Sequence, residues 1–421
     1  MNKTLLVSSL ICVALLVYAP IDTFLLREYH DHQRAYREAL SNVAKNEKET
    51  QEAKRYEVKI RQLVLPELQR IDRCVSCHVS LEDPRMDKQP LPLQTHPGNY
   101  LEVHDVGKIG CTVCHDGQGR ALTAEDAHAN RIEGWGKPML HAPYIQANCM
   151  RCHEAENLPG MELVRKGYDL LHAKGCLGCH KIEGKGGQLA TDLTYIGDAS
   201  PSLKHVIDRS YLARNSGLRE NKNLAYILES IQVPDAQPPV TPMMDFKFTD
   251  DEALALTIYL KGLTKRGIPA SYVAKRHQQS RVEIFKGEGL YDKYCVACHG
   301  ERGVGGVENR NYARGTIPAL NKLAGWMGLE YEEDAEYIAE LLNDGEDIVN
   351  MSPPLDIDGR ARILAQYKAI NNVIRKGNPA GKDDPEGPDP LIHMPSWAEG
   401  LTDGDIDGIL AYLLLQYPWE E

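Results

Sequence analysis

The sequence CVSCH at residues 74–78 recurs as CTVCH at 111–115, CMRCH at 149–153 and CLGCH at 176–180, and CVACH follows at 295–299. Each stretch has the form Cys-x-x-Cys-His, the attachment motif for c-type haem. Two thiols bind one porphyrin covalently, and the adjacent imidazole binds the iron as its proximal ligand. The sequence therefore predicts five covalently attached haem c groups. The predicted attachment residues are Cys74, Cys77, Cys111, Cys114, Cys149, Cys152, Cys176, Cys179, Cys295 and Cys298, and the proximal ligands are His78, His115, His153, His180 and His299.

Other uses of paired cysteines fit this pattern less well. Zinc sites do not need a His after every second Cys, and a thioredoxin-like redox motif would occur once, near a βαβ pattern. Iron–sulfur ligation would leave the five His unexplained. The motifs use ten of the eleven cysteines, so no disulfide framework remains, and the last one, Cys12, lies in an apolar run.

The composition bounds the class of protein. A chain of 421 residues is long enough for two to four domains. It contains only four Phe, so porphyrins would supply much of the apolar core. The net charge of −12 argues against nucleic acid as a partner and allows docking of a basic soluble carrier.

The N-terminus is apolar from residue 4 to residue 19, and the run continues to Leu26 with one interruption at Asp22. This is about the twenty residues that a bilayer span requires. A cleaved signal peptide is the rival interpretation, although Pro20 directly after a cleavage site at Ala19 fits poorly. We expect residues 1–26 to be a single-pass anchor in the inner membrane, with the haem domains in the periplasm.

Residues 27–70 are highly charged and contain no Gly, and no Pro before Pro66. This composition predicts one long polar helix without a sustained heptad pattern. We expect a helical stalk that lifts the haem domains off the membrane. A helix packed beside a partner subunit is the alternative.

Residues 71–159 form a predicted trihaem module, because three motifs lie there between loops rich in Pro, Gly and Asp. A haem used only for electron transfer needs a second axial ligand, and a second His is a common solution. The module contains four His beyond the proximal ones. We predict that three of them are distal ligands and that His141 is the reserve; the three are His96, His104 and His128.

From residue 160 a second pattern begins and occurs twice. Lys-Gly at 166–167 leads over an apolar stripe to Cys176, and Lys-Gly at 286–287 leads similarly to Cys295. Each copy ends with a Met, a short loop and an amphipathic helix, which indicates a duplicated domain. The expected capping residues are Thr249 with Glu252 and Thr402 with Asp405, and the expected packing face of the last helix is Ile406, Ile409, Leu410 and Leu413.

This order of elements resembles class I cytochrome c domains, over about 160–264 and 281–419. The resemblance implies an axial Met in each domain. In the second it implies Met394 of the HMPSW stretch, with Met351 as a rival. In the first it implies Met243, although Met244 leaves a one-residue ambiguity. The predicted domains are therefore 160–264 and 281–421, joined by a basic linker at 265–280 that we expect to be solvated.

The whole chain also resembles the membrane-anchored multihaem cytochrome subunits of quinol-oxidising complexes, such as alternative complex III and cytochrome b/Rieske-type assemblies. The residues that carry this resemblance are the anchor, LPELQRIDRCVSCH at 65–78 and the run from His96 to His128. It implies integral-membrane quinol-oxidising subunits as partners and a soluble or outer electron acceptor.

The predicted fold is mainly α, with an anchor, a stalk, a loop-rich trihaem module and two cytochrome c-like domains. The predicted function is electron transfer by a five-haem relay, without an enzymatic activity of its own. Three bis-His haems would pass electrons toward two His/Met haems of higher potential. The alternatives are a haem enzyme, such as a dihaem peroxidase or a multihaem reductase, and an oxidase-associated cytochrome subunit.

Overall fold

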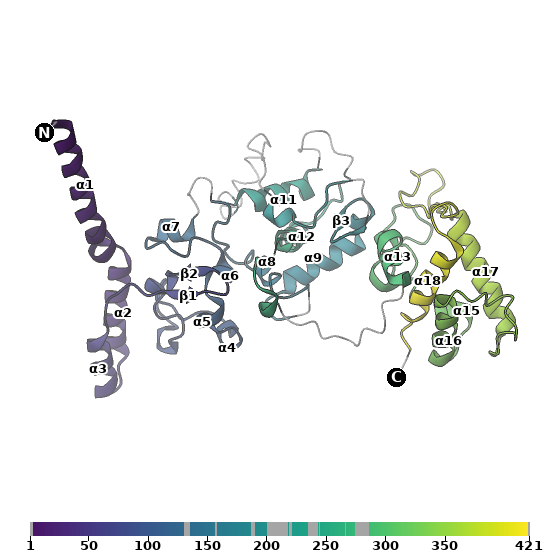
Figure 1. The fold of residues 1–421 in the computed structure, drawn as a ribbon, viewed down its shortest axis with the longest axis horizontal. Helices are drawn as coiled ribbons and strands as arrows, with labels where there is room; N and C mark the ends of the chain where they lie inside the picture. Colours follow the sequence, from purple (N-terminus) through teal and green to yellow (C-terminus); the bar gives the residue numbers. More distant parts are fainter. Residues whose placement is uncertain are drawn as a thin grey trace. The chain divides into compact units, whose positions relative to one another are not determined.

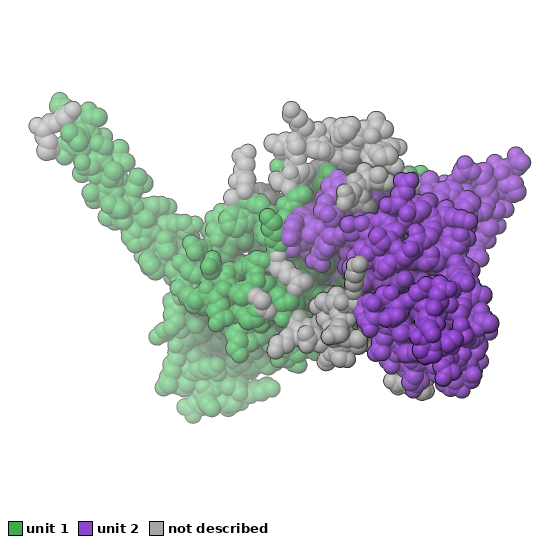
Figure 2. Space-filling view, turned by 45° about the vertical axis from the view of Figure 1, so that its right-hand side comes forward, with its two compact units in different colours: residues 1–161, 197–249, 265–274 green, residues 162–196, 250–264, 275–421 purple. Residues whose placement is uncertain are grey.

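The computed structural model describes residues 3–129, 135–155, 158–186, 190–199, 218, 221–234, 243, 245–265, 267–273 and 286–419. The chain divides into two compact units, coloured separately in Figure 2. The first comprises residues 1–161, 197–249 and 265–274, and the second comprises 162–196, 250–264 and 275–421. Helices predominate, and the strands of the described residues form two small two-stranded sheets, which confirms the mainly α fold.

Helix α1, Lys3–Ile21, lies at the N-terminal end of the chain (Figure 1). It is apolar, and its side chains are exposed. It continues through Pro20 into a π-helical turn at Asp22–Leu26. Among the described helices, this apolar N-terminal one is long enough to cross a membrane.

The prediction of a single long helix after the anchor is wrong, because two shorter helices form there. Helix α2 spans Tyr29–Val43 and α3 spans Glu47–Arg55. Ala44 is extended, and the Asn46 side chain accepts the Glu49 N–H at 2.9 Å, which starts a new helix.

These two helices pack against the loop-rich segment rather than standing alone. The hydroxyl of Tyr36 donates to Asp83 at 2.8 Å. An apolar cluster, which includes residues from both helices and from the loops, buries their shared face. Its members are Tyr36, Ala39, Leu40, Ala53, Met86 and Leu93.

Residues 71–159, the predicted trihaem module, contain little regular structure, as expected. The antiparallel strands β1, Leu63–Leu65, and β2, Arg70–Asp72, lead into it. The rest is single helical turns separated by loops. These are η2 Cys74–Ser76, η3 Pro84–Met86, α4 Tyr100–Val103, α5 Val106–Ile109, α6 Thr112–His115, α7 Ala124–His128 and α8 Gln146–Cys149.

The second unit is built on two helix crossings of the same kind. Helix α9, Glu162–Ala173, packs against α12, Asp250–Gly262, and α13, Lys286–Tyr294, packs against α18, Asp403–Leu414. A side chain at Gly167 would overlap the Ala255 carbonyl, and one at Gly287 would overlap the Gly408 carbonyl. The glycine that recurs in both copies is therefore the point of closest approach between the helices.

The C-terminal domain has an extensive apolar core. Helices α15 Leu323–Met327, α16 Glu332–Asn343 and α17 Arg360–Lys376 surround the crossing of α13 and α18. Thr402 and Asp405 form the expected capping box. The predicted packing face is confirmed, because Ile406, Ile409, Leu410 and Leu413 are all buried.

The remaining elements are short except α11. They are η4 Cys176–Gly178, β3 Lys181–Ile182, β4 Lys185–Gly186, η5 Ile196–Asp198, α11 Lys222–Gln232, η8 Ala270–Tyr272, α14 Val296–His299 and η9 Glu301–Gly303.

The prediction of a solvated linker is wrong for residues 267–273. Ile268 and Tyr272 pack instead against the cluster of Leu65, Leu68 and Val113, because their apolar side chains gain from burial.

Candidate haem sites

The five Cys-x-x-Cys-His motifs share one backbone conformation. In each, the His N–H donates to the carbonyl of the first Cys at 2.9–3.0 Å, and the second Cys N–H donates to the same carbonyl at 3.1–3.2 Å. One helical turn therefore fixes the spacing of the two thiols and the imidazole in every motif. The described cysteines form no disulfide, so both thiols of each motif are available to a porphyrin.

Two proximal His rings are oriented by backbone carbonyls. The Nδ1 atom of His180 lies 2.7 Å from the Thr191 carbonyl, and that of His299 lies 3.2 Å from the Pro318 carbonyl. A hydrogen bond at Nδ1 fixes the ring and leaves Nε2 as the metal-binding atom. These two rings therefore fit the role of proximal ligands.

Burial keeps several of these imidazoles in the metal-binding form. It lowers the pKa of His78 and of His299, and it lowers the pKa of His115 to about 4. A neutral imidazole is the form that binds a metal. Burial therefore favours the metal-binding form at these three residues.

Neighbouring motifs within the first unit lie side by side. The side chains of Cys74 and Cys111 interact directly. Burial raises the pKa of the Cys114 thiol, and the nearby Cys152 raises it further. The first motif is thus adjacent to the second, and the second to the third.

Two of the predicted distal His face proximal His. The ring centres of His96 and His115 are 6.2 Å apart, as are those of His104 and His153. Because a metal–imidazole bond is about 2 Å long and the ring centre lies about 1 Å behind the bonded nitrogen, two imidazoles on one iron have centres about 6 Å apart. Both pairs fit a bis-His haem.

The free ends of these distal rings are also held. The Nδ1 atom of His96 lies 3.0 Å from the Pro97 carbonyl, and that of His104 lies 3.0 Å from the Tyr100 carbonyl. Each ring therefore keeps Nε2 available, as the proximal rings of the second unit do.

The surroundings of His78 contain more than one candidate. Burial is the largest cause of the lowered pKa of His78, and the charges of His128 and then of His32 lower it further. His128 ends α7, and the first N–H of α7, at Ala124, donates to Glu28 at 2.8 Å. Sequence reasoning left His32 out because it assigned residues 27–70 to a stalk, whereas α2 packs against the loop-rich segment through Met86 and Leu93.

The reserve residue His141 has a different position. Its charge lowers the pKa of His128, after the effect of burial, and it contributes weakly to the lowered pKa of His115. It lies near two other candidate ligands without forming a ring pair with either among the described contacts.

The axial methionines remain predictions. Met394 is half-buried, and its backbone forms a bridge with Asn378 through hydrogen bonds of 3.1 and 3.3 Å. Its rival Met351 is also half-buried. Met243 belongs to the first unit, whereas the motif at 176–180 belongs to the second, and Met244 lies outside the described residues.

Sequence reasoning missed a buried ionic network between the second and third motifs. Arg151, inside CMRCH, pairs with Asp116 at 2.6 Å, and their side chains are 3% and 6% exposed. Asn148 donates to the same carboxylate at 3.0 Å. Asp72 accepts the N–H groups of Cys111 and Thr112 at 2.6 and 2.9 Å. The available signal was the pair of opposite charges inside and directly after two motifs.

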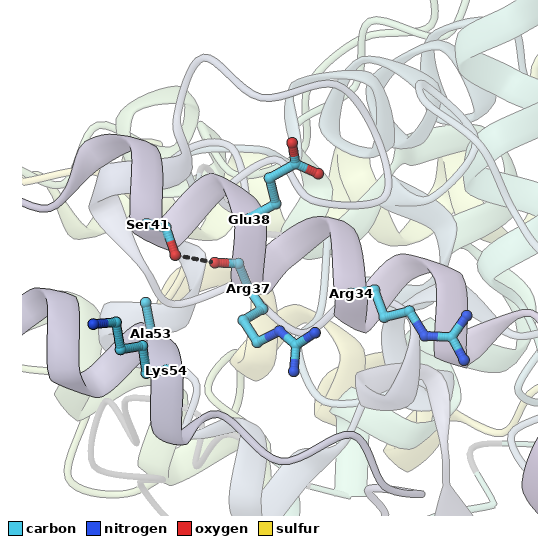
Figure 3. A pocket seen from close by; sticks show the side chains of 6 residues that line it. All are labelled: Arg34, Arg37, Glu38, Ser41, Ala53 and Lys54. Carbon is cyan, nitrogen blue, oxygen red and sulfur yellow. Dashed lines mark hydrogen bonds between the residues drawn. The ribbon is translucent and has the colours of Figure 1, made fainter.

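A hollow between α2 and α3 is separate from these residues (Figure 3). The Ser41 hydroxyl donates to the Arg37 carbonyl at 3.0 Å within it. Its lining contains no candidate haem ligand and consists of Arg34, Arg37, Glu38, Ser41, Ala53 and Lys54.

The attachment turns and the paired helix crossings define a class of protein, the c-type cytochromes. Comparison with known families agrees. Residues 164–264 match the family described as Cytochrome c, and residues 283–413 match the family described as Cytochrome C oxidase, cbb3-type, subunit III. The C-terminal half of this c-type cytochrome thus carries two cytochrome c domains, as the resemblance implied. No curated protein and no solved structure matches the chain.

Proposed function

We propose that this cytochrome passes electrons through five covalently attached haem c groups, from a quinol-oxidising membrane partner to an outer acceptor. The observation that carries the proposal is the single conformation shared by all five attachment turns. Bound haem supplies the reversible one-electron chemistry of its iron. In the first unit the first attachment turn lies next to the second and the second next to the third, and in the second unit η4 lies next to α14, as a relay requires.

The first three haems have closed axial positions in this proposal. His96 pairs with His115, and His104 pairs with His153, as their ring separations of 6.2 Å support. For His78 the nearby candidates are His128 and His32, and we propose His128. Closed axial positions favour electron transfer over catalysis, which needs an open site at iron.

The N-terminal helix supports a membrane location. We propose that α1 anchors the protein in the inner membrane and that both haem-bearing units lie in the periplasm, where covalent haem attachment takes place. The length and apolar character of α1 favour this arrangement.

The test is gentle purification from membranes. We expect mass spectrometry to find five haem masses on the chain, integral-membrane subunits in the same complex, and reduction of the haems by quinol. A chain with fewer haems would contradict the relay. High-spin signals in the resting protein, or turnover of peroxide, would favour a haem enzyme instead.

One observation favours a second candidate function, an oxidase-associated cytochrome subunit. Residues 283–413 match a family named for a subunit of cbb3-type cytochrome c oxidase. Co-purification with copper–haem oxidase subunits, in place of a quinol-oxidising complex, would decide for this alternative.

A further inference from the structure

We propose that the two cytochrome c domains share a fixed interface that holds their attachment turns together as one dihaem pair. The inference rests on the proposed relay and adds to it the residues that join its last two carriers. All of these residues belong to the second unit.

The two attachment turns lie against each other. Turn η4, which carries the motif at 176–180, contacts α14, which carries the motif at 295–299. The side chains of Cys179 and Cys298 lie close enough to interact. Because each thiol is bonded to a porphyrin edge in the mature protein, adjacent cysteines place two porphyrin edges side by side.

The C-terminal end of α9 is joined to the loop after the last motif. The Glu308 N–H donates to the Ala173 carbonyl at 2.8 Å, and Lys174 pairs with the Glu308 carboxylate at 2.8 and 2.9 Å. A side chain at Gly175 would overlap Val307. The chain just before Cys176 therefore lies against the second domain with no room for a side chain at Gly175.

Glu301 makes the second contact, close after His299. The Tyr168 hydroxyl of α9 donates to its carboxylate, and the His172 Nε2 lies 4.0 Å from it. Burial raises the pKa of Tyr168, and the bond to Glu301 raises it further. The hydroxyl thus remains a donor, which ties the helix before one motif to the residues after the other.

A third contact joins β4 to α13. Lys185 of β4 pairs with Asp292 of α13 at 3.1 Å. The side chains are 40% and 25% exposed, so this pair is partly screened. Three polar contacts around two neighbouring attachment turns fix the separation of the domains, which tethering alone would leave variable.

Zero-length crosslinking of the full haem-loaded chain tests the interface directly. A carbodiimide should join Lys174 to Glu308, and mass spectrometry should find that crosslinked peptide. The Glu308→Gln variant should lose it. Lys382 and Asp389, which pair at 2.9 Å within the C-terminal domain, are the internal control. Formation of the control crosslink without the crosslink between Lys174 and Glu308 would overturn the proposal.

Charge reversal tests whether the contact holds the haems as a pair. Lys174→Glu or Glu308→Lys alone should weaken the magnetic coupling between the last two ferric haems in electron paramagnetic resonance, and the double swap should restore it. Coupling unchanged in both single variants would contradict the interface. If quinol fails to reduce the protein while crosslink and coupling persist, the relay is refuted and the interface stands.

Discussion

At the scale of single residues, the loss of Arg151 should clearly lower the folding stability of the protein. Replacing Arg151 by Met leaves the Asp116 carboxylate buried and unpaired between two haem motifs. Breaking a buried ion pair in this way costs about 3–5 kcal/mol of folding free energy. Chemical unfolding of the haem-loaded protein, followed by circular dichroism, should show a loss of this size.

The matched control is Arg34→Met. Arg34 pairs with Asp31 at 3.3 Å, with side chains 58% and 81% exposed. Removing an exposed pair costs less than about 1 kcal/mol. Equal losses in the two variants would show that the buried network does not hold the motifs together.

The distal His assignments make a spectroscopic prediction. His96→Ala should open one axial position at the second haem and convert one low-spin signal to high spin, seen by electron paramagnetic resonance. His141→Ala should leave the spectrum unchanged. In a variant that lacks the second haem through Cys111→Ala and Cys114→Ala, His96→Ala should have no further effect. A high-spin signal in that background would assign His96 to another haem.

The limits of sequence reasoning are visible at this scale. The motif residues could be predicted because cysteine and histidine spacing is local chemistry. The pairing of His96 with His115 could not, because the loops that bring them together have no periodic signal. The charges of Arg151 and Asp116 are visible in the sequence, but their burial depends on contacts between two distant motifs.

At the scale of elements, the helix crossings make a matched prediction within α13. Gly287→Ala places a methyl group against the Gly408 carbonyl, so the helices must separate. Such overpacking costs about 1–3 kcal/mol of folding free energy. Gly289, two residues further, has open space around it, and alanine there should stabilise the helix by roughly 0.5–1 kcal/mol. Thermal unfolding should show opposite shifts; shifts of the same sign would refute the crossing.

The contact between α17 and α18 predicts a pH effect. Asp407 accepts the Tyr367 hydroxyl at 2.6 Å, and burial raises the pKa of its carboxyl. The folded state therefore favours the protonated form, so stability is lost as pH rises through the folded pKa. Asp407→Asn should stabilise the protein at pH 7, and this gain should disappear as pH falls toward about 4. Unfolding measured across that range checks the sign; a gain that grows at low pH contradicts it.

The break between α2 and α3 could have been predicted from the sequence. Asn46 followed three residues later by Glu49 is a helix-start signature. The residues on both sides have high helix propensity, so one continuous helix was predicted instead. The packing of Tyr36 on Asp83 could not be predicted, because it joins residues 47 positions apart through a loop-rich segment.

At the scale of the whole molecule, the duplicated domains were predictable and their surroundings were not. The order of Lys-Gly, haem motif, Met and final helix repeats in the sequence, and both family matches fall on these copies. Residues 197–249, however, group with the first unit, although they lie between α9 and α12 in the chain. Such grouping depends on contacts that no local pattern records.

The predicted axial ligands lead to a prediction of the reduction potentials of the five haems. Methionine ligation raises the potential of a haem relative to a second His. A redox titration should therefore resolve three haems at low potential and two at high potential, with electrons flowing from the first group to the second. Met394→His should lower one of the two high potentials, while Met351→His should leave both in place. If the two highest-potential haems keep their values in Met394→His, the assignment of Met394 is wrong. If the cytochrome c domains titrate lowest, the direction of the relay is wrong.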